Sequence, residues 1–98
     1  MAAKIPPITD EPRSTVRKDL RFTLYSRAGC TLCEEMLHEL AALPAAYGIA
    51  VDVTDVDEVP ALRERYGHKI PVLLLSGELV CHGRLDASEV HKALAYHR

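Results

Sequence analysis

The sequence predicts a layered α/β domain whose elements follow the order β-α-β-α-β-β-α. Runs rich in strand-forming residues alternate with stretches whose apolar residues recur at helical spacing. Proline and glycine stand between these segments, where they interrupt regular structure. Helices that connect strands of one sheet pack on its faces, which produces the layers. The length of 98 residues, with 48% apolar and 27% charged residues, suits one globular domain.

The first half of the chain predicts two strands joined by a helix. Residues 22–26 are strand-forming types, and residues 49–54 form a second strand in which valines alternate with polar residues. Residues 31–43 are predicted to be helical, because apolar residues recur along one face. Pro44 ends this helix, since a proline disfavours helical geometry in the residue before it. The predicted apolar stripe consists of Leu32, Cys33, Met36, Leu37, Leu40 and Leu43.

A second helix is predicted over residues 58–66. Asp57 can cap it, because an aspartate side chain accepts a hydrogen bond from a free N–H of the first turn. Pro60 is tolerated in that first turn, where its missing N–H would have no helical partner. Gly67 suits a left-handed position just past the end of the helix.

The rest of the chain predicts a hairpin and a final helix. Residues 71–75 are a continuous aliphatic run, typical of a strand covered on both faces. Residues 76–78 form the turn, and residues 79–82 return as the second strand. Asp86 is predicted to cap the last helix, with Glu89 at the position of a capping box. The buried stripe of this helix consists of Val90, Ala93 and Leu94.

Residues 1–20 are predicted to be a flexible leader, and residues 21–98 the folded domain. The prolines and scarce aromatic residues of the leader leave little apolar surface to offset the entropy of ordering it. It lacks the continuous apolar stretch of an export signal, so we expect a cytoplasmic protein. No run of 18 apolar residues is present, so no membrane partner is expected. The net charge of −2 argues against a nucleic-acid partner.

Cys30 and Cys33 stand at the predicted junction of the first strand and the first helix. Their spacing puts both sulfurs on one side of the first helical turn, within bridging reach. Free N–H groups and the macrodipole at a helix start favour a thiolate, which is the species that attacks a disulfide. A bridge across so short a loop adds little stability, so this pair suits a bond that is made and broken.

Position also predicts the role of each residue around the pair. We expect Cys30 to be the exposed attacking nucleophile, and Cys33 to be more buried and to resolve the mixed disulfide. Arg27 is a candidate to stabilise the Cys30 thiolate or to bind a substrate carboxylate. Glu34 and Glu35 should push the thiol pKa upward, which opposes the effect of Arg27.

Residues 22–33, FTLYSRAGCTLC, and residues 55–94 resemble the glutaredoxin-like family of the thioredoxin-fold superfamily. The resemblance covers residues 21–97. It implies a thioredoxin fold, with a four-stranded mixed sheet flanked by three helices. It also implies a thiol–disulfide oxidoreductase that reduces protein or glutathione mixed disulfides. Such a protein needs no bound cofactor, and glutathione is a candidate reductant; the sequence does not identify a reductase partner.

The resemblance assigns a substrate-binding role to Ile70 and Pro71. In this family the bond before the matching proline is cis, and its loop lies against the cysteines. The backbone of the residue before that proline pairs with the bound thiol peptide. From the residues alone, Pro71 is also compatible with the start of a strand. Thr31 and Leu32 replace the Pro-Tyr of common glutaredoxins, so the resemblance is closest to divergent members.

Two other functions stay open at this point. The same thiolates are also suitable ligands for a metal or an iron–sulfur cluster, as in some glutaredoxin-like proteins. Zinc sites commonly take paired C-x-x-C or histidine elements, and only one such pair is present, so no metal site is predicted. A redox-fold interaction protein with little turnover is the other alternative. Cys81 is interpreted as a small buried hydrophobe, the alternative being a third redox thiol.

Overall fold

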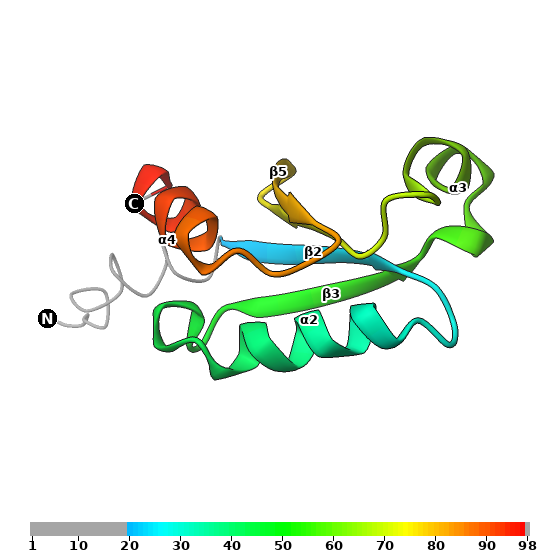
Figure 1. The fold of residues 1–98 in the computed structure, drawn as a ribbon. Coiled ribbons are helices and arrows are strands. Elements are labelled where there is room, and N and C mark those ends of the chain that lie inside the picture. The colour runs from blue at the N-terminus through cyan, green and yellow to red at the C-terminus, as the bar shows by residue number, and fades with distance from the viewer. Residues whose placement is uncertain (1–19, 98) are drawn as a thin grey trace, which may run out of the picture.

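Four strands and three α-helices form residues 20–97, the part of the chain described by a computed structural model (Figure 1). Their order confirms the predicted β-α-β-α-β-β-α arrangement. The elements are β2 (Arg21–Ser26), α2 (Thr31–Ala42), β3 (Ala50–Asp55), α3 (Pro60–Tyr66), β4 (Val72–Leu75), β5 (Glu78–His82) and α4 (Ala87–Tyr96), with 3₁₀ turns η2 (Pro44–Ala46) and η3 (Val56–Glu58).

The predicted leader, residues 1–20, lies outside the described residues except for Leu20, which is buried. The hydrophobic core therefore begins one residue before the predicted domain boundary. Within residues 20–97, no helix is long and apolar enough to cross a membrane.

The four strands form one mixed sheet in the order β3-β2-β4-β5. β2 and β3 are parallel, because α2 carries the chain back between them, whereas β4 is antiparallel to both β2 and β5. Ser76 and Gly77 form the tight turn between β4 and β5, with φ values of 50° and 87°. Two consecutive left-handed residues give a turn whose twist matches that of the flanking strands.

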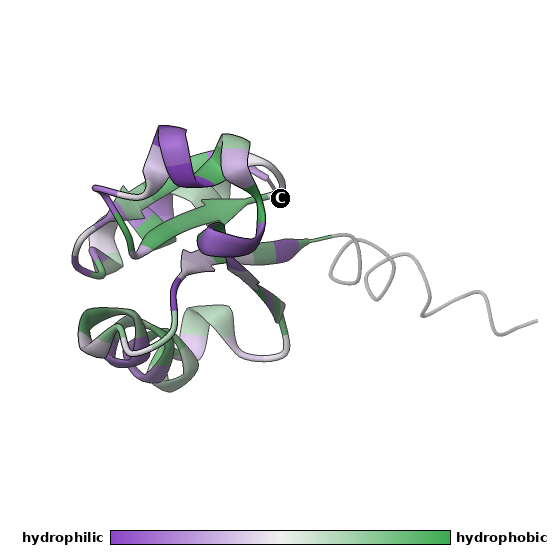
Figure 2. Ribbon diagram, turned by 90° about the vertical axis from the view of Figure 1, so that its right-hand side faces the viewer, coloured by the Kyte–Doolittle hydropathy of each residue, from purple (hydrophilic) through white to green (hydrophobic). Residues whose placement is uncertain are grey.

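One face of the sheet forms the main core together with α2 and α4. Figure 1 shows α2 running along the strands, and Figure 2 shows hydrophobic residues concentrated on the strands between the helices. All four residues of β4 are buried, which confirms the strand predicted to be covered on both faces. The core cluster consists of Leu20, Phe22, Leu24, Met36, Leu40, Ala46, Ile49, Leu73, Leu75, Val90 and Leu94.

The other face of the sheet is covered in part by α3. Tyr25 follows Leu24 in β2, so its side chain points to the opposite side from the core. Its ring lies 4.9 Å from the ring of Tyr66, the last residue of α3, between centroids. The two tyrosines therefore fix α3 near the end of β2 that leads to the cysteine pair.

The start and end of the second helix differ from prediction. Asp57 belongs to η3 and does not cap the helix; α3 begins at Pro60, whose fixed φ suits a first helical position. Gly67 is right-handed, with φ −56° and ψ −28°, so the predicted left-handed glycine is wrong. A steric restriction explains why this position is a glycine, because a Cβ there would lie 2.5 Å from the carbonyl oxygen of Arg63.

Some predicted inward positions are exposed. Leu32 and Leu37 are 46% and 37% exposed, so the buried face of α2 is narrower than its apolar stripe. Val53 is 55% exposed, because β3 lies at the edge of the sheet.

The predicted cap of the last helix is confirmed, because the Asp86 carboxylate accepts the Glu89 N–H at 3.2 Å. The buried residues of α2 are Cys33, Met36 and Leu40.

Candidate active site

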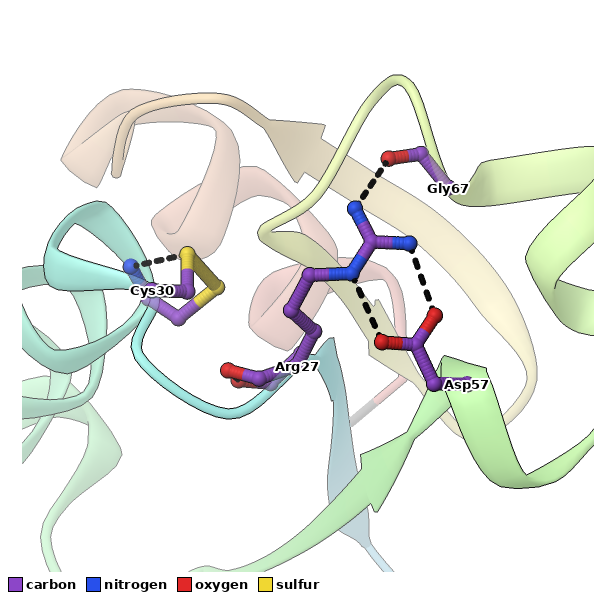
Figure 3. The surroundings of a disulfide bond; sticks show 6 residues. Arg27, Cys30, Asp57 and Gly67 are labelled. Atoms are coloured by element: carbon purple, nitrogen blue, oxygen red, sulfur yellow. Dashed lines mark hydrogen bonds and ion pairs between the residues drawn. A yellow bond between two sulfur atoms is a disulfide. The ribbon is translucent and has the colours of Figure 1, made fainter.

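Cys30 lies between β2 and α2 and caps the helix. Its backbone is extended, and its Sγ accepts a hydrogen bond from the Cys33 N–H at 3.1 Å (Figure 3). The turn before it is closed by the Cys30 N–H, which donates to the Arg27 carbonyl at 3.2 Å. Gly29 has a φ of +77°, a conformation that glycine adopts without a steric cost. The sequence thus places one sulfur on the free N–H groups of a helix start.

Cys33 lies one helical turn further on and forms a disulfide with Cys30 (Figure 3). The two Cα atoms are 5.2 Å apart, a distance typical of disulfides. Cys33 is 2% exposed and belongs to the buried face of α2, whereas Cys30 is half-buried. The predicted difference in burial is confirmed, and Cys30 is the sulfur that an incoming reagent can reach.

Reduction of this bond would leave Cys30 with a favourable partner already in place. The Cys33 N–H that now contacts the sulfur can donate to a thiolate, and the helix dipole acts in the same sense. Glu34 and Glu35 are exposed on the first turns of α2, where solvent screens their opposing charge. The site therefore combines a reachable sulfur with a group suited to stabilising its anion.

Arg27 has a different partner from either of those predicted. Its Nε and Nη2 donate to the two carboxylate oxygens of Asp57 at 2.9 and 2.8 Å, and its Nη1 donates to the Gly67 carbonyl at 3.3 Å. Figure 3 shows the guanidinium turned away from the disulfide and toward these groups. Arg27 thus ties the loop before Cys30 to η3 and to the segment after α3.

Ile70 and Pro71 lie on the segment that follows Gly67. The bond between them is cis, as the resemblance implied. Pro71 is buried and Ile70 is half-buried, and the Pro71 carbonyl accepts the Gly83 N–H at 2.7 Å. The segment is therefore held at both sides, by Arg27 through Gly67 and by the loop after β5. Its substrate-binding role stays a prediction.

The contribution of Asp57 and Gly67 was not predicted from the sequence. Asp57 was assigned to a helix cap, and the Gly67 carbonyl carries no side-chain signal at all. Asp57 lies 30 residues from Arg27, so only the parallel pairing of β2 with β3 brings the two together. An isolated arginine and an isolated aspartate at such a separation leave no local pattern to detect.

A small cleft separates the first turns of α2 from the loop after β5. It is lined by Leu32 and Met36 with Glu35 and Glu39 on the helix side, and by Gly83, Arg84 and Leu85 on the loop side. Leu32 is thus an exposed apolar residue between the two cysteines in the sequence, beside a loop that carries Arg84. The cleft lies beside the first turns of α2, the helix that begins directly after Cys30.

Cys81 lies on β5, paired in register with Leu73, and packs half-buried against the core cluster. Burial raises the pKa of its thiol, which disfavours the reactive thiolate. Within residues 20–97, no three His, Cys, Asp or Glu side chains come together in a group that could hold a metal ion.

Acid should remove the contribution of the Arg27–Asp57 ion pair to stability. Hydrogen bonds from the Arg27 guanidinium hold the pKa of Asp57 below its ordinary value of 3.8. A carboxyl with a lowered folded pKa stabilises the fold above its unfolded pKa, and this is lost as the pH falls through the folded pKa. We expect Asp57→Asn to lower the midpoint of thermal unfolding slightly at pH 7, and this difference from the wild type to shrink as the pH falls below 3.8 and through the lowered pKa of Asp57.

Thermal unfolding of both chains from pH 7 to pH 2 measures this difference. Glu64→Gln, on the exposed surface of α3, is the control. Its unfolding midpoint should differ from that of the wild type by an amount that does not shrink at low pH. A difference for Asp57→Asn that stays constant over this range would contradict the prediction.

Comparison with known proteins identifies the family of the chain. Residues 21–95 match the family described as "Glutaredoxin-like domain (DUF836)". The chain is also 31% identical over 77 residues to Rv0508 of Mycobacterium tuberculosis and to Mb0520 of Mycobacterium bovis, both named as uncharacterized proteins. Each match covers 74% of this chain and 79% of the relative. Residues 21–95, which match the family, contain the cysteine pair and every described strand.

Solved structures show the same fold. The solution structure of protein Ne2328 from Nitrosomonas europaea has a TM-score of 0.69 at 25% identity, covering 95% of this chain and 98% of that one. Target protein XcR50 from X. campestris has a TM-score of 0.55 at 28% identity, covering 76% and 96%. Oxidized mitochondrial thioredoxin 3 from Saccharomyces cerevisiae, at 21% identity, covers 90% and 89% with a TM-score of 0.54. This chain therefore belongs to the glutaredoxin-like DUF836 family, has a thioredoxin fold, and carries a cysteine pair consistent with redox function.

Proposed function

We propose that the chain is a thiol–disulfide oxidoreductase that reduces protein or glutathione mixed disulfides. The observation that supports this most strongly is the position of Cys30. Its half-buried sulfur caps α2 and accepts the Cys33 N–H, and the buried Cys33 sulfur is bonded to it. A nucleophile stabilised at a helix start, with a second sulfur one turn away, has the two parts that disulfide exchange requires.

The exchange proceeds in two steps from the reduced pair. The Cys30 thiolate attacks one sulfur of the substrate disulfide, which forms a mixed disulfide and releases the other substrate sulfur as a thiolate. Cys33 then loses its proton and attacks the Cys30 sulfur, which releases the second substrate thiolate and forms the Cys30–Cys33 bond. Two electrons pass to the substrate, and solvent protonates its two thiolates.

An external thiol must return the pair to its reduced state. Glutathione is our proposed reductant, and two molecules of it would be oxidised to the disulfide for each bond reduced. The proposed partners are proteins that carry an accessible disulfide, or glutathione mixed disulfides of proteins. The cytoplasm is the proposed compartment, because its thiol pool is kept reduced.

Cys33→Ser should trap the first intermediate of this mechanism. The variant retains the Cys30 nucleophile but lacks the sulfur that resolves the mixed disulfide, so a covalent adduct should accumulate on Cys30. The measurement is intact mass after the reduced variant is incubated with glutathione disulfide or with a disulfide-bonded protein. The expected adduct is one substrate thiol per chain, removed by dithiothreitol.

Two controls make this result specific. Adding Cys30→Ser to the variant should remove the adduct, whereas adding Cys81→Ser should leave it. If Cys33→Ser forms no adduct, or if the adduct maps to Cys81, the proposed mechanism is wrong.

A further inference from the structure

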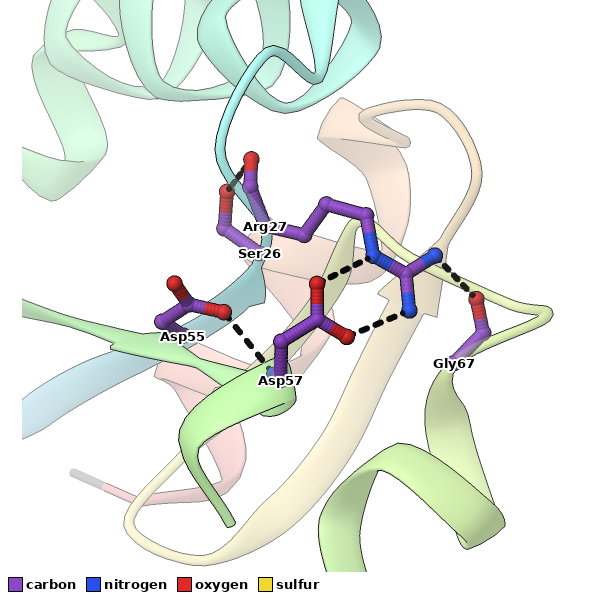
Figure 4. A network of polar contacts seen from close by, with 5 residues as sticks. All are labelled: Ser26, Arg27, Asp55, Asp57 and Gly67. Atoms are coloured by element: carbon purple, nitrogen blue, oxygen red, sulfur yellow. Dashed lines mark hydrogen bonds and ion pairs between the residues drawn. The ribbon is translucent and has the colours of Figure 1, made fainter. Parts of the chain in front are cut away.

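One residue connects the backbone of Cys30 to two distant segments. The Arg27 carbonyl accepts the Cys30 N–H, while the Arg27 guanidinium contacts the Asp57 carboxylate and the Gly67 carbonyl (Figure 4). We call these side-chain contacts the Arg27 bridge. Through it, the loop that carries the nucleophile is attached to η3 and to the segment after α3.

Both ends of the Arg27 bridge are themselves held in place. The Asp57 N–H donates to the Asp55 carboxylate at 2.8 Å, which fixes the turn that presents the Asp57 side chain (Figure 4). The Gly67 N–H donates to the Arg63 carbonyl at 2.9 Å, and Gly67 is buried with no room for a side chain. A planar guanidinium with several donors can reach a carboxylate and a carbonyl at once, which a lysine ammonium on a flexible stem does poorly.

We propose that Arg27 is a positioning residue for Cys30, which keeps its sulfur on the amino end of α2 and open to a substrate disulfide. This inference rests on the proposed function. An exposed ion pair of this kind contributes little to folding stability, so its expected effect is on the orientation of the loop. Attack on a disulfide depends strongly on the approach of the sulfur, because small misplacements of a reacting group slow reactions.

The chain contains a matched pair that lacks this connection. Arg21 donates to both oxygens of Asp52 at 2.9 and 2.7 Å, and both side chains are exposed. This pair joins β2 to β3, and Arg21 begins β2, whereas Arg27 follows the other end of that strand. Both pairs join a guanidinium to the two oxygens of a carboxylate, but only Arg27 also contacts a carbonyl and lies beside Cys30.

The direction in which the pKa of the Cys30 thiol changes distinguishes a positioning role of Arg27 from a purely electrostatic one. If Arg27 positions the sulfur, then Arg27→Gln and Asp57→Asn both loosen the loop and both raise the pKa of the Cys30 thiol. If Arg27 acts only as a cation, Asp57→Asn frees its charge and lowers that pKa, opposite to Arg27→Gln. A purely structural role would change the unfolding midpoint and leave the thiol pKa unchanged. Glu34, Glu35 and Lys69, the charged residues near Cys30 and Ile70 in the sequence, are the same in every variant.

The experiment compares full-length Arg27→Gln, Arg27→Lys and Asp57→Asn with Arg21→Gln and Asp52→Asn. The reduced chains are alkylated with iodoacetamide from pH 4 to pH 10, and modification of the Cys30 peptide is followed by mass spectrometry. We expect the apparent Cys30 pKa to rise by about half a unit in all three bridge variants, and to stay at the wild-type value in the control pair.

The rate of reduction of a disulfide-bonded protein is measured on the same set. We expect the bridge variants to reduce the disulfide roughly tenfold more slowly than the wild type, and this loss of rate to persist at a pH where Cys30 is fully ionised. The control pair should react at rates close to that of the wild type. Opposite pKa changes in Arg27→Gln and Asp57→Asn, or bridge variants that match the control pair, would overturn the inference. If the wild-type chain reduces no disulfide, the proposed function fails, and the alkylation profiles still decide the positioning role.

Discussion

Cys30→Ser is expected to reduce the rate of disulfide reduction to that of the reductant alone. A serine hydroxyl is not ionised near neutral pH and forms no disulfide, so the first step of the exchange has no nucleophile. Cys33 cannot take over that step, because the residue is only 2% exposed and lies on the buried face of α2. The measurement is the initial rate of reduction of a disulfide-bonded protein, with glutathione as the electron source.

Cys81→Ser is the matched control for this loss. This variant makes the same cysteine-to-serine change at a half-buried position on β5, and Cys81 takes no part in the proposed exchange. Its rate should stay near that of the wild type, and circular dichroism should show that each variant is folded. Activity retained in Cys30→Ser, or an equal loss in Cys81→Ser, would show that the reacting sulfur has been misassigned.

The order of the elements was predictable because it is encoded locally. The aliphatic run before Ser76 and the apolar spacing along α2 each reflect the geometry of a single element. The junction of β2 and α2 follows from the same signals, and so does the placement of Cys30 at a helix start. The burial difference between Cys30 and Cys33 also followed, because Cys33 shares a helix face with Met36 and Leu40.

The packing of elements against one another was less predictable. The apolar spacing predicts Leu32 and Leu37 to be core residues. Both are exposed, because the sheet covers only a narrow strip of α2. Val53 alternates as an inward residue should, but the edge position of β3 leaves it exposed. Exposure depends on which strand lies at the edge, and that is a property of the whole sheet.

The polar part of the site depends on contacts between distant residues. Arg27 was expected to act on Cys30 or a substrate, because only Cys30 and its neighbours were visible nearby in the sequence. Its partners, Asp57 and the Gly67 carbonyl, are 30 and 40 residues away. Pairing of β2 with β3 and the return of the chain through α3 are needed before these groups meet.

Leu73→Ala should destabilise the fold by about 2–5 kcal/mol, a large part of the roughly 5–15 kcal/mol that stabilises a small domain. Leu73 is fully buried in the central strand β4, opposite Leu24 of β2 and Cys81 of β5. Truncation leaves a cavity between the sheet and the helices that pack on it, and the rigid strands on both sides cannot close it. Urea unfolding followed by circular dichroism measures the change.

Leu79→Ala makes the same chemical change in the same hairpin, where the side chain is 60% exposed. It should alter the free energy of unfolding by no more than about 0.5 kcal/mol, since little apolar surface is lost from the core. Equal losses in the two variants would mean that the core does not lie on the face of β4 that Leu73 shares with Leu75. Leu73 also stands two residues after Pro71, so we expect its loss to make the segment around Pro71 the first to lose order on heating. The proposed disulfide reduction should therefore fail at a lower temperature in Leu73→Ala than in Leu79→Ala.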